Sequence, residues 1–247
     1  MTMRNWLTSG KLITAIGAWL LLSTTAVVAI ALIGARPRTR AEILMGGGLV
    51  LLWVFCGGFL MRLARDRIRE VVAAIRLDWR VKFVLFATLL ALIEEAIATG
   101  MTNLAPLFGV PVGAAYITAS ANYLKVIGLH SVVVFVPMFI GWAFLLGRLD
   151  FSPNAVFLLF GLTGVTSEAS LSGWQAFAEI GMWIFIYGLM VYLPAYCIPG
   201  ERAASRPRWW QYGIAVFVPV LFAIPVAVVI GILHPARVDF PPIPPGT

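Results

Sequence analysis

The sequence predicts an all-α, polytopic integral membrane protein with about seven transmembrane helices. Of its 247 residues, 61% are hydrophobic and only 12% are charged, whereas soluble domains carry about 25% charged residues. The mean hydropathy of +0.94 favours the same class. Several apolar runs also reach or approach the ~20 residues that a helix needs to cross a bilayer. We expect a single helical membrane domain over residues 1–233.

Seven apolar segments define the expected helices. The first is longer than the 7–15 apolar residues typical of a signal peptide, so we expect it to remain as a membrane anchor. The fifth is the shortest, because Gly, Thr and Ser interrupt its apolar run. Pro137 and Gly141 predict a bend in the fourth. In chain order the segments are residues 12–33, 43–61, 81–102, 126–146, 154–171, 174–198 and 209–233.

The distribution of basic residues predicts the orientation of the chain. Thirteen of the 18 lysines and arginines fall in the N-terminal segment or in loops on the same side of the membrane. By the positive-inside rule the N-terminus is cytoplasmic and the C-terminus external, which favours a multi-pass protein of the plasma membrane. Residues 62–82 carry seven of the thirteen. A short interfacial helix there could contact lipid headgroups or a nucleic acid, but a topology signal is favoured and no nucleic-acid partner is expected.

The C-terminal tail, residues 234–247, contains five prolines and cannot continue the last helix. We expect it to be extended, external and solvated. A membrane-protein partner docking on a polyproline-like conformation of this tail is the alternative.

Two adjacent glutamates, Glu94 and Glu95, lie in the middle of the third apolar segment. A carboxylate near the bilayer centre costs at least ~2.5–3.5 kcal/mol on insertion scales, so such a pair indicates a functional site. At 1.5 Å per residue, the pair lies slightly to the outer side of the midplane, and His130, Glu168 and Glu179 lie in the outer half of their segments. The sequence therefore predicts a site in the outer half of the membrane, with Glu168 and Glu179 in secondary roles.

Helical periodicity assigns faces around this site. Glu95 shares a polar stripe with Thr99, whereas Glu94 points about 100° away. Thr99 and Asn103 are predicted as further secondary site residues, although threonines at this spacing also suit close packing of membrane helices. Residues 104–125 predict a re-entrant loop or an interfacial helix over the glutamates, or an ordinary external loop.

The Glu94–Glu95 pair followed by His130 resembles the glutamate-type intramembrane proteases of the CAAX prenyl protease and bacteriocin-processing (Abi) family. That family is polytopic and helical, and its pattern is EExxxR, then FxxxH, then HxxxN or a variant. Thr99 stands at the arginine position, Val126 stands at the phenylalanine position, and no HxxxN occurs. The resemblance covers residues 94–130 and implies a diverged or inactive intramembrane protease or hydrolase.

In such a site one carboxylate acts as the base for water, the other orients the water or stays protonated, and a histidine stabilises the oxyanion. We expect these roles for Glu95, Glu94 and His130. Two non-enzymatic alternatives remain open. One is a carrier coupled to protons or cations. A carrier is disfavoured because no polar path continues through the inner half of the membrane. The other is an accessory subunit whose glutamates meet a membrane-protein partner.

The sequence predicts no particular cofactor or metal. Cys56 and Cys197 fall within expected helices without metal-binding spacing, which favours buried thiols. The seventh segment has no lysine for a retinal Schiff base, and no phosphate-binding loop or HExxH motif occurs.

Overall fold

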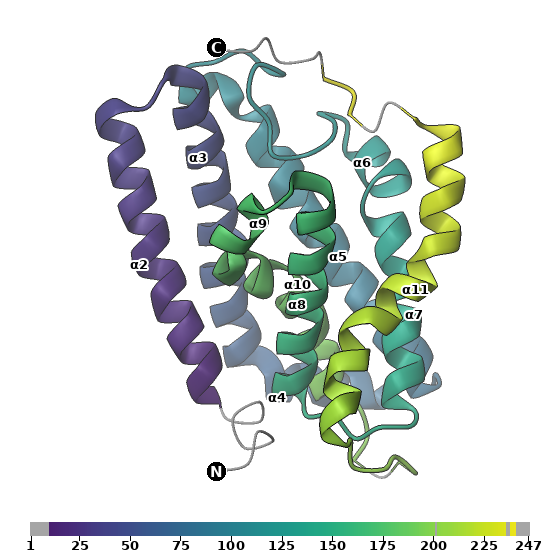
Figure 1. Cartoon of the computed structure of the whole chain (residues 1–247). Helices are drawn as coiled ribbons and strands as arrows, with labels where there is room; N and C mark the ends of the chain where they lie inside the picture. Colours follow the sequence, from purple (N-terminus) through teal and green to yellow (C-terminus); the bar gives the residue numbers. More distant parts are fainter. Residues whose placement is uncertain (1–9, 201, 236–237, 241–247) are drawn as a thin grey trace.

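Long helices that run alternately up and down make up most of the protein, which is 79% helical in the computed structural model (Figure 1). The structure describes residues 10–200, 202–235 and 238–240, apart from the side chains of residues 171, 172 and 175. Within those ranges no β-strand occurs. The predicted all-α class is confirmed.

Two long antiparallel helices form one side of the molecule (Figure 1). The first is α2 (Gly10–Gly34). The second begins as α3 (Pro37–Leu49) and continues through the π-helical turns of η1 (Val50–Gly57) into α4 (Gly58–Ala74). Pro37 suits its first turn, where no backbone N–H is needed. Since this helix runs unbroken for 38 residues, residues 62–74 of the basic segment continue it and do not form a separate helix.

The next helices carry the predicted site and include one break. After α5 (Trp79–Asn103), the short η2 (Ala105–Phe108) leads toward α6 (Tyr123–Leu129) and α7 (Val132–Leu146). α6 and α7 meet at an angle of 43°. The backbone N–H groups of His130 and Ser131 both donate to the carbonyl of Val126, which ends α6. The predicted bend in segment 126–146 therefore falls at His130 and not at Pro137, which lies inside α7.

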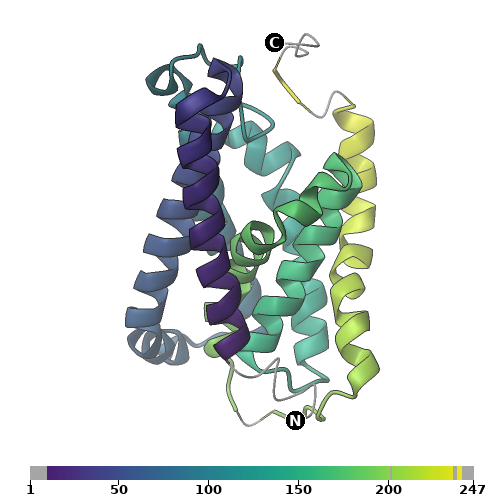
Figure 2. The ribbon, with the colours of Figure 1, turned by 60° about the vertical axis from the view of Figure 1, so that its left-hand side comes forward.

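The last predicted segments are α8 (Pro153–Ser172), α9 (Gln175–Ala178), α10 (Ile180–Tyr196) and α11 (Trp209–Leu233). The predicted helix 174–198 is divided at Glu179. Gly173 ends α8 with φ +76°, a backbone conformation that favours glycine. Figure 2 shows α9 and the beginning of α10 beside α2, where a Cβ on Gly181 would lie 3.7 Å from Ile16.

Small residues let α8 and α10 pack closely. A Cβ on Gly161 would come within 2.7 Å of the carbonyl oxygen of Ile184, and a Cβ on Gly188 within 2.8 Å of that of Phe157. The hydroxyl of Thr163 donates to the carbonyl of Val216 on α11 at 2.8 Å. Gly161 and Thr163 on α8, together with Gly188 on α10, therefore allow neighbouring helices to pack closely. Small and hydroxyl-bearing residues commonly have this role between membrane helices.

Several helices are long and apolar enough to cross a bilayer. Among the described residues these are α2, the Pro37–Ala74 helix and α11, with the bent α6–α7 pair as a fourth. This supports an integral membrane protein.

The segment between η2 and α6 is irregular and is bound to the end of α5. Thr102 Oγ1 accepts hydrogen bonds from the Ile117 amide at 3.3 Å and the Thr118 hydroxyl at 3.0 Å. Asn103 donates to the carbonyl of Ala121 at 2.9 Å. We call residues 110–122 the roof segment.

The chain beyond α11 returns to the roof segment. The Asp239 amide donates to the carbonyl of Ala119 at 2.9 Å, and the ring of Phe240 stacks on Tyr116 with centroids 4.4 Å apart. These contacts differ from the expected solvated tail, because the tail packs against the protein where it is described. Residues 236–237 and 241–247 of the predicted tail lie outside the described residues.

Candidate functional site

A cavity of about 790 Å³ lies below the roof segment, between α2, α3, α5, α7 and α10. The roof contributes residues 116–119 to its wall. The wall also includes five of the seven residues predicted for the site: Glu94, Glu95, His130, Glu168 and Glu179. The structure therefore brings together residues from four separate parts of the chain.

Glu94 and Glu95 are the most buried carboxyl groups of this cavity, with 5% and 8% of their surface exposed. Both line it, although helical periodicity separates them by about 100° around α5. Glu94, Glu95 and Ala98 are the residues of α5 that line it, so two adjacent positions of this helix border the cavity. Within the described part of the chain, no lysine or arginine lies within 4.0 Å of either carboxyl group.

A hydrogen bond ties α6, which precedes the histidine, to α5, which carries this pair. The Tyr123 hydroxyl donates to the carbonyl of Leu92 at 2.8 Å, about one turn before Glu95. His130 then falls at the break between α6 and α7, where its ring borders the cavity. Its Nε2 is buried and has no hydrogen-bond partner among the described residues.

His234, at the end of α11, lies beside His130. The two rings meet edge to face, with 5.0 Å between their centroids. His234 is the first residue of the expected solvated tail, and its place beside His130 goes with the return of the chain to the roof. No local motif indicates this pairing.

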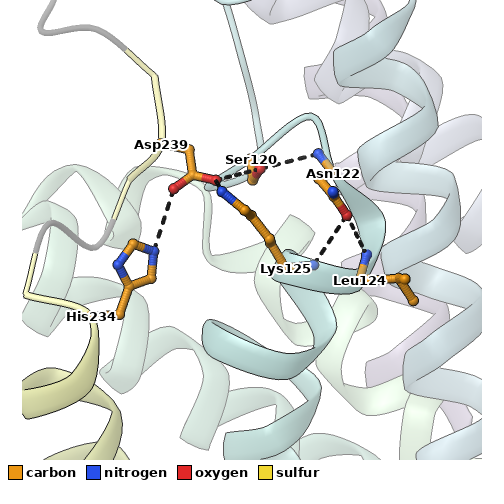
Figure 3. A network of polar contacts seen from close by, with 6 residues as sticks. All are labelled: Ser120, Asn122, Leu124, Lys125, His234 and Asp239. Carbon is orange, nitrogen blue, oxygen red and sulfur yellow. Dashed lines mark hydrogen bonds and ion pairs between the residues drawn. The ribbon is translucent and has the colours of Figure 1, made fainter.

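Asp239 links His234 to the roof and to α6 (Figure 3). Its carboxylate accepts hydrogen bonds from Lys125 Nζ at 3.0 Å and from the Ser120 hydroxyl at 2.9 Å, and lies 3.4 Å from His234 Nε2. The hydrogen bonds from Lys125 and Ser120 hold the pKa of Asp239 below its ordinary value. Asn122 caps α6 by accepting from the amides of Leu124 and Lys125.

Glu168 is oriented by α10. The Tyr187 hydroxyl donates to Glu168 Oε1 at 2.5 Å. The ring of Tyr187 packs directly over Gly164, where a Cβ would come within 2.3 Å of it. The small residues of α8 are visible in the sequence, but nothing in the sequence indicates that Tyr187 packs against them.

Glu179 sits at the junction of α9 and α10 and is exposed at the edge of the cavity. Trp183, one turn later, also lines the cavity, and its Nε1 has no hydrogen-bond partner among the described residues. Ser131 brings a hydroxyl beside Glu95. Ser131 and Trp183 are polar wall residues that sequence reasoning missed, since neither belongs to a recognisable motif.

Thr99 and Asn103 do not belong to the cavity wall, so their predicted secondary roles lack a structural basis. Asn103 donates to the carbonyls of Thr99 and Ala121, which makes it a clamp for the roof segment. Thr99 Oγ1 is buried and has no hydrogen-bond partner within the described ranges.

Metal coordination finds little support in the described residues, which contain no group of three His, Cys, Asp or Glu side chains arranged to hold an ion. Both cysteines are free thiols, and only Cys197 is buried as predicted, because Cys56 is exposed on η1. The wall therefore supplies carboxyl groups, one imidazole and hydroxyl groups as its chemical functions.

Comparisons of this chain with models of known protein families, with curated proteins and with solved structures found no match. The resemblance to the CAAX prenyl protease and Abi family remains a prediction that depends on Glu94, Glu95 and His130.

Proposed function

We propose that this protein is a glutamate-type hydrolase that acts on an acyl bond within the membrane, as a diverged relative of the CAAX prenyl protease and Abi family. The observation that carries the proposal is the convergence of Glu94, Glu95 and His130 on one cavity. Buried carboxyl groups without a neighbouring cation are costly, and such groups concentrate at functional sites.

In the proposed reaction, Glu95 takes a proton from a water molecule that Glu94 orients. The resulting hydroxide attacks the carbonyl carbon of the substrate, and the unpartnered Nε2 of His130 stabilises the oxyanion that forms. The carbon–heteroatom bond then breaks, and the proton on Glu95 passes to the leaving group. The buried setting supports this assignment, because preorganised donors act more strongly where water is excluded.

The shape of the cavity favours a hydrolase over a carrier. Its wall ends at Val50, Met138 and Met190, and no described residue from 51–93, 139–166 or 191–240 contributes to it. A carrier needs a second route to the opposite side, whereas a hydrolase needs only one opening.

For the membrane arrangement we propose seven crossings, with the roof segment and the tail outside and α4 at the cytoplasmic surface. The alternating direction of the helices supports this arrangement (Figure 1). So does the excess of basic residues in the loops at the opposite end from the roof, because such residues favour the cytoplasmic side. In this orientation the cavity opens in the outer half of the membrane.

The experiment is a hydrolysis assay with the purified protein in liposomes, using a library of apolar peptides analysed by mass spectrometry. Substituting Glu95→Gln removes the base with little change in volume, so cleavage should fall ~10²–10⁴-fold. Glu70→Gln is the matched control, because Glu70 is exposed on α4 and lies outside the cavity. Equal cleavage by the two variants would remove Glu95 as the base.

A further inference from the structure

We propose that the ligand of this cavity is an organic cation carried on an apolar body, such as a hydrophobic amine or a quaternary ammonium or phosphonium group. The inference rests on the proposed function in treating the cavity as the substrate site. It adds the chemical class of the substrate, which the catalytic residues alone do not specify.

The charged side chains of the wall all have the same sign. Its acidic members are Glu42, Glu94, Glu95, Glu168 and Glu179, and the described wall contains no lysine or arginine. Glu42 has a cation of its own, since Arg38 lies 3.0 Å from it. The other four surround a space that a positive charge can enter without meeting a like charge.

The second observation is the state of the glutamate pair. Glu94 and Glu95 are more than nine-tenths buried and border the cavity, and neither forms an ion pair with any residue that the structure describes. Buried carboxylates are normally paired with a cation or bound to a metal. A cation bound elsewhere in the same cavity, beside Glu168 and Glu179, would offset part of the negative charge of this pair.

Aromatic side chains provide the third observation, independent of the carboxyl groups. Trp19, Tyr116, Phe135, Trp183 and Tyr187 all contribute to the wall, from four different segments of the chain. Aromatic faces attract cations through the ring quadrupole and also bind apolar groups, and their assembly around a pocket is the usual way in which quaternary ammonium ligands are recognised.

The distribution of these groups suggests how the ligand binds. Ile186, Met138 and Met190 border the deeper part of the cavity beside α7 and α10, whereas Glu179 is exposed at its edge. A cation near Glu168 and Glu179 would leave Glu94 and Glu95 to act on a bond next to the charged group. A volume of about 790 Å³ accommodates a drug-sized molecule.

Tetraphenylphosphonium and tetraphenylborate are suitable probes, because they have nearly the same shape and opposite charge. Binding to the full chain in phosphatidylcholine nanodiscs would be measured by equilibrium dialysis, with the binding to empty nanodiscs subtracted. We expect saturable binding of tetraphenylphosphonium at one site, at least tenfold tighter than that of tetraphenylborate. The double substitution Glu168→Gln and Glu179→Gln should weaken tetraphenylphosphonium binding at least tenfold, whereas Glu70→Gln should leave it unchanged.

Tetraphenylborate binding as tight as tetraphenylphosphonium binding would overturn the inference, and so would full affinity in the double variant. If the double variant does not fold, Glu179→Gln alone decides, because Glu179 is exposed and its substitution leaves the core intact. If Glu179→Gln then binds tetraphenylphosphonium as tightly as the unmodified chain does, the proposal is contradicted. Since binding requires no turnover, cation preference without hydrolysis would contradict the proposed function alone, and hydrolysis without cation preference would contradict this inference alone.

Discussion

The imidazole rings of His130 and His234 lie edge to face, 5.0 Å apart between centroids, where the break between α6 and α7 meets the end of α11. His234 in turn lies 3.4 Å from Asp239, whose other contacts are with Lys125 and Ser120 (Figure 3). The chain after α11 is thus bound both to the cavity histidine and to the roof. We expect this connection to keep His130 in place and the roof closed.

The first prediction concerns Asp239→Asn, which removes the charge that attracts Lys125 and His234. Hydrogen exchange of the amides of residues 238–240, corrected for intrinsic rates, should be faster in the variant at pH 7. The reason is that the hydrogen bond from the Asp239 amide to the carbonyl of Ala119 should open more often once the side chain is no longer anchored. Glu70→Gln is the charge control, and exchange rates equal to those of the unmodified chain would show that the carboxylate does not secure the tail.

The same contact should depend on pH. Hydrogen bonds from Lys125 and Ser120 lower the pKa of Asp239 in the folded protein. A carboxyl group with a lowered pKa contributes its stabilisation above its unfolded pKa of about 3.9 and loses it as the pH falls through the folded value. Tail protection in the unmodified chain should therefore persist from neutral pH to about 4 and decrease below it. The Asp239→Asn variant should lack this acid transition, and a transition in both proteins would point to another group.

The third prediction compares two buried threonines of α5. Thr102 accepts hydrogen bonds from Ile117 and Thr118, whereas Thr99 Oγ1 has no partner among the described residues. Thr102→Val should lower the free energy of unfolding by about 1 kcal/mol, because it leaves the partly buried Ile117 amide without its acceptor. Thr99→Val should be neutral or slightly stabilising and should leave turnover unchanged. The measurement is chemical denaturation in detergent, and equal losses in the two variants would contradict these assignments.

The fourth prediction tests the contact between α8 and α10. Gly161→Ala places a Cβ 2.7 Å from the backbone carbonyl of Ile184, which cannot move without shifting α10. We expect a loss of about 1–3 kcal/mol in unfolding free energy. The control is Gly213→Ala on α11, which meets nothing within 4 Å and should stabilise its helix by up to about 1 kcal/mol. Thermal unfolding of both variants measures the difference, and a stable Gly161→Ala variant would show that α10 can move aside.

Much of the helical framework could be predicted from the sequence, because apolar length is a strong local signal. The expected helix 209–233 coincides with α11, and the expected 12–33 differs from α2 by two residues at the N-terminal end and one at the C-terminal end. The positions of the breaks within helices were not predicted. Hydropathy does not indicate the turn at His130, because that turn depends on backbone hydrogen bonds to Val126. It also does not indicate the division at Glu179.

The site could be predicted in part, because isolated charges in apolar helices are conspicuous. Glu94, Glu95, His130, Glu168 and Glu179 line one cavity, as their common depth predicts. Helical phase placed Thr99 on the same stripe as Glu95, but Thr99 does not line the cavity, since phase ignores how neighbouring helices shape it. His234, Asp239 and Tyr187 were missed because their contacts depend on tertiary structure and leave no pattern in the sequence.

The most direct test of the central claim is hydrolysis in water enriched in ¹⁸O, with the protein in liposomes and its products analysed by mass spectrometry. If Glu95 activates water, each cleaved bond should add one ¹⁸O atom to the new carboxyl group, and labelled product should fall ~10²–10⁴-fold in Glu95→Gln but not in Glu70→Gln. Absence of labelled product from the unmodified chain, or equal labelling by Glu95→Gln, would contradict the assignment of this cavity as a hydrolytic site.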